Sequence, residues 1–246
     1  PQPGKPARLA WFFEAPDGLL HLTAFVNSPN PSVQIQTPDG RSLFIENGSP
    51  TRAVSSALAR RLPIFHQRLD GLLLPGSKVD VLEGLPDFLD RFLPGWILWN
   101  ESTADSRSAS RLQEWTQTGG IPLLGLEVGQ SISLGKGARI EALTLDDQGA
   151  LSGLSWNAFR VIFVNGGSPV SLAELPAFWS SPGLNLVLSD IDLLEIPPPD
   201  WLDLQPGLVI APSGAPGLPS NWLSLDRHGW VEVQTDGQEL WVVAAR

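Results

Sequence analysis

Carboxylate pairs are the first candidates for chemistry in this sequence of 246 residues. Asp80 lies three positions before Glu83, and Asp87 lies three before Asp90. Two neighbouring carboxyl groups can act as general acid and general base. The residues around Asp87 and Asp90 have the periodicity of an amphipathic helix, so we favour a solvated helix face for that pair and keep Asp80 with Glu83 as an open alternative.

A second acidic group offers oxygen ligands of the kind that Ca²⁺ and Mg²⁺ prefer. Its members are Asp146, Asp147, Asp190, Asp192 and Glu195. Their spacing matches no EF-hand loop, so the sequence does not favour a calcium site of that type.

Nucleophilic catalysis has little support from motifs. His21, His66 and His228 are present, but no Gly-x-Ser-x-Gly elbow would present a serine to them. His66 has no partner at a fixed spacing, and a lone histidine is more often structural than functional. The turn at residues 165–167, Asn-Gly-Gly, belongs to no phosphate-binding pattern, so we predict a plain turn there.

Composition restricts the function further. The net charge of −10 and the pI of about 4.7 disfavour a broad nucleic-acid surface, which needs clustered Lys and Arg. Arginines do gather near one predicted helix, where a solvated face is the simpler explanation. They are Arg52, Arg60, Arg61 and Arg68. Three tryptophans near the second half's loops could stack on bases or on a partner. They are Trp156, Trp201 and Trp222.

The ends and the hydropathy give expectations about context. No Cys is present, which excludes disulfides and thiolate sites, and no Met is present, so we expect a processed piece of a longer protein. Residues 1–18, which open with Pro-Gln-Pro-Gly-Lys-Pro, read as a linker or N-terminal extension. No apolar run approaches the roughly 20 residues that span a bilayer, and no signal peptide is visible.

Strands and helices alternate through residues 19–246, which we assign to a single domain. Alternating apolar residues predict a β-meander over residues 19–45, and a helix follows over 51–62. Leu72–Leu74 form a buried strand, followed by a polar turn and a helix that ends near Phe92. Later apolar runs predict further strands and a closing hairpin. They cover residues 139–145, 149–154, 159–164, 185–188, 208–211 and 222–237.

The order of these landmarks resembles metallo-β-lactamase-fold hydrolases, specifically the C-terminal domain of ComEC-type DNA-internalisation proteins. Thr37-Pro38-Asp39-Gly40 matches the turn of that family's opening meander, and the closing hairpin with Thr235-Asp236-Gly237 matches its end. The resemblance implies an αββα sandwich, an α/β fold in which two mixed sheets pack face to face with helices outside.

The family's metal-binding segment reads Ser-His-Pro-His-Ala-Asp-His-Ile-Gly-Gly-Leu. Aligned on Gly84-Leu85, its three histidines fall on Gly76, Lys78 and Val81, and only its aspartate is kept, as Asp80. Gly and Val offer no side-chain donor, and an ammonium group repels a cation.

Later ligand positions are also replaced. Gly166 follows the strand where relatives carry Thr-Gly-Asp, Pro198 or Pro199 stands at a ligand histidine, and Leu218 replaces the histidine of Gly-His-Pro-Ser. Glu46 stands at the family's Asp-Gly-Gly, so Glu46 and Asp80 are the residual carboxylates. We therefore expect no cofactor here, although the family uses Zn or Mn.

The resemblance implies a role in DNA uptake during transformation, and the replaced ligands imply a catalytically inactive domain with a structural, docking or strand-guiding role. Implied partners are single-stranded DNA, bound weakly, and the membrane channel of the same protein or other DNA-uptake proteins. The implied location is a soluble extracytoplasmic domain of a bacterial inner-membrane protein. A hydrolase or nuclease with a rebuilt metal site, and an unrelated binding module, remain the alternatives.

Overall fold

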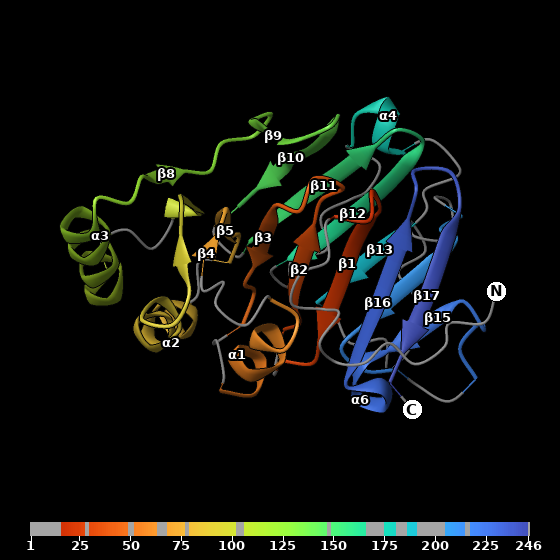
Figure 1. Cartoon of the computed structure of the whole chain (residues 1–246), viewed down its shortest axis with the longest axis horizontal. Coiled ribbons are helices and arrows are strands. Elements are labelled where there is room, and N and C mark those ends of the chain that lie inside the picture. The colour runs from red at the N-terminus through yellow and green to blue at the C-terminus, as the bar shows by residue number, and fades with distance from the viewer. Residues whose placement is uncertain are drawn as a thin grey trace.

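Two mixed β-sheets lie face to face, with helices on their outer surfaces (Figure 1). The computed structural model describes residues 16–27, 30–48, 52–62, 68–76, 79–101, 106–146, 149–165, 175–180, 186–190, 205–214 and 217–245, and side chains from residue 81 onward in the segment that starts at residue 79. In this part of the chain, no helix is long and apolar enough to cross a membrane.

The first sheet has the strand order β17-β16-β1-β2-β3-β5-β7-β8 within the described residues. Its antiparallel half, β17 to β3, contains the predicted meander and the closing hairpin, and β3, β5, β7 and β8 run parallel. The bounds are β1 (Leu20–Phe25), β2 (Ser32–Gln36), β3 (Ser42–Ile45), β5 (Gly71–Leu74), β7 (Ile97–Trp99), β8 (Leu123–Gly125), β16 (Trp230–Thr235) and β17 (Leu240–Ala244).

The second sheet has the order β15-β14-β13-β12-β11-β10-β9 within the same residues. Strands β9 to β12 are antiparallel, and β12 to β15 are parallel. The bounds are β9 (Ser131–Gly135), β10 (Ala138–Leu145), β11 (Ala150–Trp156), β12 (Phe159–Asn165), β13 (Leu186–Ser189), β14 (Leu208–Ala211) and β15 (Trp222–Ser224). A short parallel pair, β4 (Arg68–Leu69) and β6 (Leu93–Pro94), accompanies the sheets.

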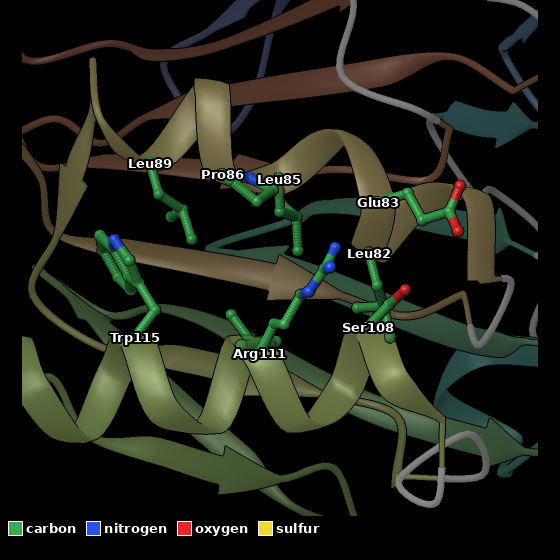
Figure 2. Close-up of a pocket in the computed structure, with 9 residues that line it drawn as sticks. Leu82, Glu83, Leu85, Pro86, Leu89, Ser108, Arg111 and Trp115 are labelled. Atoms are coloured by element: carbon green, nitrogen blue, oxygen red, sulfur yellow. The ribbon is translucent and has the colours of Figure 1, made fainter.

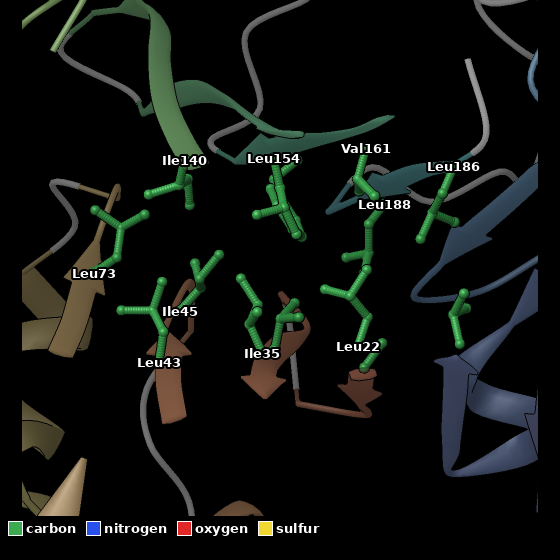
Figure 3. Close-up of a cluster of buried hydrophobic side chains, with 14 of the residues drawn as sticks. Leu22, Ile35, Leu43, Ile45, Leu73, Ile140, Leu154, Val161, Leu186 and Leu188 are labelled. Carbon is green, nitrogen blue, oxygen red and sulfur yellow. The ribbon is translucent and has the colours of Figure 1, made fainter. Parts of the chain in front are cut away.

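The contact between the sheets is a continuous apolar core (Figure 3). Leu22, Ile35 and Ile45 from the first sheet face Leu154 and Val161 from the second. Alternate residues of each strand point to this core, as the period of two in the sequence requires. The predicted face-to-face packing is thus confirmed.

Helices cover the outer face of the first sheet. They are α1 (Arg52–Ala59), α2 (Val79–Leu89) and α3 (Arg107–Gly119). Phe44, Leu72 and Leu74 from the sheet pack in one cluster with Phe88 from α2 and Leu112 from α3. On the second sheet, the indole of Trp179 in α4 (Ala177–Ser180) packs against Gly153. The one-turn helix α6 (Leu225–His228) comes just before β16.

Helix α2 corrects one boundary. The sequence predicts a polar turn between Leu74 and the helix, but the helix already begins at Val79 and contains Pro86. Val81, Leu82 and Leu85 are all buried at helical spacing, so apolar burial outweighs the roughly 3 kcal/mol that an interior proline costs.

Strand β17 forms an apolar edge of the first sheet. Trp241, Val242 and Val243 are 42%, 40% and 46% exposed, and the strand carries no charged residue. The opposite edge strand, β8, has three residues, and β9 at one edge of the second sheet alternates with serine. Short or polar strands are ways in which proteins protect sheet edges, and β17 uses neither.

Candidate functional site

Polar side chains gather where the parallel strands of both sheets end. Asn47 follows β3, Asn100 follows β7, and Asn165 ends β12. Carboxyl ends of parallel strands meet at one edge of a sheet, and this edge is where α/β folds place their sites. We call Asn27, Asn30, Ser32, Glu46, Asn47, Asn100 and Asn165 the strand-end network.

Glu46 is the buried acid of this network. Its Oε1 atom accepts hydrogen bonds from Ser32 Oγ at 2.8 Å, Asn27 Nδ2 at 3.0 Å and the Gly48 amide at 3.1 Å. Its Oε2 atom has no partner among the described residues. Burial raises the pKa of Glu46 to about 8, although these hydrogen bonds lower it in part. The raised pKa means that Glu46 keeps its proton to higher pH than an ordinary carboxyl group, and the protonated form binds a cation less well than the carboxylate.

Asn47 and Asn165 join the two sheets. Asn47 Nδ2 donates to Asn165 Oδ1 at 2.5 Å and to the Pro31 carbonyl at 3.1 Å. The Asn47 carbonyl accepts from Asn30 Nδ2 at 3.0 Å. Both Asn47 and Asn165 are 2% exposed, so this contact is made away from solvent.

Asn100 makes a similar connection further along the first sheet. Its Nδ2 atom donates to the carbonyls of Pro75 at 3.2 Å and Asp146 at 3.0 Å, which lie after β5 and after β10. Two loops from different sheets are thus fixed to one amide group.

The structure places several of the predicted site residues and leaves others undescribed. Gly76 lies beside the Asn47 carbonyl, and Val81 is buried among the side chains beneath the helices. Leu218 packs against the outer apolar cluster of the second sheet. Lys78, Gly166 and Pro198 lie outside the described residues, as does the side chain of Asp80, whose backbone belongs to α2.

The described residues at the compared ligand positions do not supply the ligands of a Zn or Mn centre. Where the family has histidines, Val81 and Leu218 bring aliphatic groups and Gly76 brings no side chain. Amide N–H groups point at Glu46 Oε1 and Asn165 Oδ1, and a cation would be repelled by these donors. Glu46 Oε2 and Asn47 Oδ1 have no hydrogen-bond partner within the described residues. Within the described residues, no three His, Cys, Asp or Glu side chains come together as ligands.

The candidate residues of the alternative chemistries are placed as follows. Asp87 and Asp90 are exposed, as predicted, and so is Glu83. Trp156 and Trp222, proposed for stacking, are only 7% and 8% exposed, and this expectation is wrong for them because both fill apolar clusters. Asp147, Asp192, Glu195, Trp201 and His66 lie outside the described residues.

His21 belongs to a chain of charged groups beneath α1 rather than to a triad. Its ring nitrogens contact Glu232 Oε1 at 3.1 Å and Asp17 Oδ2 at 2.9 Å, and Arg61 Nη1 donates to Glu232 Oε2 at 2.5 Å. The Arg61 guanidinium also lies 4.5 Å from the ring centre of Trp230. We call Asp17, His21, Arg61 and Glu232 the α1 brace.

The α1 brace shifts two pKa values. Burial alone would raise the pKa of Glu232, but hydrogen bonds from His21, Arg61 and Gln234 and the Arg61 charge lower it to about 2. Burial alone would lower the pKa of His21, but its bonds and attraction to Glu232 and Asp17 raise it.

Sequence reasoning missed most of the strand-end network. It selected Glu46, but Asn47, Asn100 and Asn165 were not assigned a role. The sequence did carry a signal for these asparagines. Asn100 and Asn165 directly follow buried strand residues, and Asn47 follows such a run after Glu46. Hydrogen bonding between residues 118 positions apart, as for Asn47 and Asn165, cannot be inferred from spacing.

Comparison with known proteins supports the fold. No family model matches the sequence, and no curated protein matches it. Among solved structures, the metallo-β-lactamase fold protein YhfI from Bacillus subtilis shares 14% identity at a TM-score of 0.54, over 82% of this chain and 90% of that one. A diphosphatase of the PhnP family also shares 14% identity, at a TM-score of 0.53, over 92% of this chain and 99% of that one. This chain has the metallo-β-lactamase fold.

Proposed function

We propose that this chain is a catalytically inactive metallo-β-lactamase-like domain of a ComEC-type competence protein. Its role in DNA uptake would be structural, docking or strand-guiding. The support for the competence family is the order of sequence landmarks, from Thr37-Pro38-Asp39-Gly40 to the closing hairpin, on a chain that has the corresponding fold.

The strand-end network is the observation that carries the proposed inactivity. Two-metal hydrolysis needs several anionic or imidazole ligands to hold the ions and to position the nucleophile. Here Asn47, Asn100 and Asn27 use their amide nitrogens to bind oxygens at 2.5–3.2 Å, and Glu46 is buried with its pKa raised to about 8. The strand ends are therefore held together by neutral hydrogen bonds.

The proposed setting follows the same resemblance. The domain would be the soluble extracytoplasmic part of a bacterial inner-membrane protein. Its partners would be the membrane channel of that protein or other DNA-uptake proteins, with weak binding of single-stranded DNA.

Calorimetric titration of the chelator-treated domain with Mn²⁺ and Zn²⁺ tests the inactivity. We expect no stoichiometric binding at micromolar concentration, no change in Tm on adding a chelator, and no cleavage of single-stranded DNA with either ion. Binding of one or two ions per chain with cleavage would overturn the proposal and favour the hydrolase with a rebuilt site, for which Asp80→Asn is the first variant to assay.

Fluorescence anisotropy with a labelled single-stranded oligonucleotide tests the competence role separately. Weak, salt-sensitive binding is expected. No binding at low salt, together with no metal binding, would favour the unrelated binding module.

A further inference from the structure

A groove separates α2 and α3 on the helix layer of the first sheet (Figure 2). The two helices run in the same direction along it, from Leu82 to Leu89 in α2 and from Ser108 to Trp115 in α3. No residue of the strand-end network lines it.

The floor of the groove is aliphatic. Leu82, Leu85, Leu89 and Leu112 are buried, and Trp115 forms a half-buried wall. The cavity volume is about 30 Å³. This is room for the tip of one aliphatic side chain, because a single water needs about 10–15 Å³ by this measure. Pockets for cofactors and drug-sized ligands are far larger, at roughly 300–1,000 Å³.

Arg111 gives the groove a charge preference. Its side chain rises from α3 into the space below Leu85 and Leu82 (Figure 2), and it has no hydrogen bond or ion pair with any described residue. Arg107 lies one turn earlier on the same helix face and has none either. Glu83 also lines the groove but does not pair with Arg111. A free guanidinium beside apolar surface is suited to bind a carboxylate through two parallel hydrogen bonds.

Pro86 adds a hydrogen-bond acceptor to the wall. It lines the groove together with Leu82, four positions earlier in α2. Because proline has no N–H group, it cannot donate the helical hydrogen bond to the Leu82 carbonyl. The Leu82 carbonyl therefore lacks its usual helical donor, and a backbone N–H group of a partner can supply one.

We propose that the α2–α3 groove is a docking site for an acidic segment of a partner protein that carries an aliphatic side chain next to a carboxylate. The aliphatic tip fills the cavity over Leu85 and Leu112, and the carboxylate pairs with Arg111. Within the groove, Arg111 on α3 is the one cation among the described residues of the lining, and it offers a carboxylate a partner on the side away from Glu83 on α2.

A small probe with both features is 4-methylpentanoate, a branched aliphatic chain with one carboxylate. In a ¹⁵N NMR titration we expect saturable shifts of the Trp115 indole and of the Leu82 and Leu85 amides, in the millimolar range typical of so small a ligand. Arg111→Gln is expected to weaken binding at least about fivefold. Arg52→Gln, another exposed arginine, serves as the matched control and is expected to leave binding unchanged.

Two further probes separate the parts of the proposal. The cation 4-methylpentylamine is expected to bind more weakly than the carboxylate, and inorganic phosphate is expected not to shift the Leu85 amide. No saturable shift with the carboxylate, equal binding of the amine, or insensitivity to Arg111→Gln would each overturn the proposal. These titrations contain neither metal nor DNA, so their failure is distinguishable from failure of the proposed function.

Discussion

Asn27, Asn47 and Asn100 each use one amide nitrogen to join two oxygen atoms from different segments. A bound cation can hold several oxygens in the same way, but it requires ligands that stay ionised. An amide needs no ionisation, so its connections persist with pH and without metal. The three side chains are also almost fully buried, so water cannot replace their hydrogen bonds when a side chain is removed.

Replacing Asn100 with alanine should lower the free energy of unfolding by about 1–3 kcal/mol, because the Pro75 and Asp146 carbonyls lose a shared donor in a buried place. Urea denaturation followed by tryptophan fluorescence measures this. Asn221→Ala is the control, since Asn221 also donates to two carbonyls but lies nearer to solvent. Equal, small losses in both variants would mean that Asn100 does not hold the loops together.

Glu46→Gln should remove a pH dependence of stability. The folded-state pKa of Glu46 is about 8 and its ordinary value is 4.5, so the unfolded chain releases its proton first. Stability conferred by the neutral acid is therefore lost steadily as pH rises from 4.5 to about 8. The amide cannot ionise, so the variant should be more stable than the parent at pH 8 by a few kcal/mol.

Urea titrations from pH 5 to pH 9 check this expectation for Glu46. Exposed Glu114→Gln is the matched control and should keep the parental slope. A parental slope in Glu46→Gln as well would show that another group causes the pH dependence.

The candidate site was only partly predictable at this scale. Under the proposed resemblance, the sequence predicts replaced ligands at Gly76, Val81 and Leu218, since glycine and aliphatic side chains have no donor atoms. The chemistry that takes their place could not be read, because Asn47 meets Asn165 only after two sheets have packed.

Among the elements, α1 is fixed to the first sheet by the α1 brace as well as by apolar contacts. Val54 and Leu58 bury the inner face of the helix, and Arg61, just after its end, reaches Glu232 on β16. This joins the start of the chain to its last hairpin, because His21 connects the same glutamate to Asp17.

The α1 brace should contribute most between pH 4.5 and pH 6.5. The lowered pKa of Glu232 means that its contribution, present above 4.5, is lost as pH falls toward about 2. The raised pKa of His21 means that its contribution, complete below 6.5, is lost as pH rises through the raised value. Thermal unfolding of Glu232→Gln should show a lower Tm than the parent, with the largest difference inside this window.

A matched control for the α1 brace is Glu239→Gln, an exposed acid in the turn before β17. A Tm difference for Glu232→Gln that is constant from pH 3 to pH 9 would contradict the assigned role of charge.

Element type was more predictable than element boundary. The meander, the closing hairpin and the buried strands follow from periodicity and turn residues, and the structure confirms them. Helix α2 was placed too late because Gly84 and Pro86 are turn residues in most contexts. Packing of Val81, Leu82 and Leu85 against the sheet outweighs that local preference.

For the molecule as a whole, the exposed edge of β17 is the surface most prone to self-association. Its backbone pairs with β16 on one side, and Trp241 and Val243 lie on the outer face, beside Gln234 and Glu232. Trp241→Lys with Val243→Lys should reduce self-association at high protein concentration, because charged side chains on an edge disfavour pairing with another strand.

Sedimentation of the double variant and the parent at equal concentration measures this effect. Replacing two exposed polar residues away from the edge, Gln113→Lys and Gln117→Lys on α3, controls for the change of net charge. If both double variants behave alike, reduced net charge rather than the β17 edge explains the difference.

The position of β1 between β2 and β16 also determines when the first sheet can be completed during synthesis. His21 and its partner Glu232 are 211 positions apart, so a ribosome adding about 5–20 residues per second needs about 10–40 s to deliver the second after the first. Until then β1 is the edge strand of the first sheet, and its apolar side chains lack the packing that β16 provides. A nascent chain that stalls before β16 would be a substrate for chaperones or proteases, however stable the finished protein is.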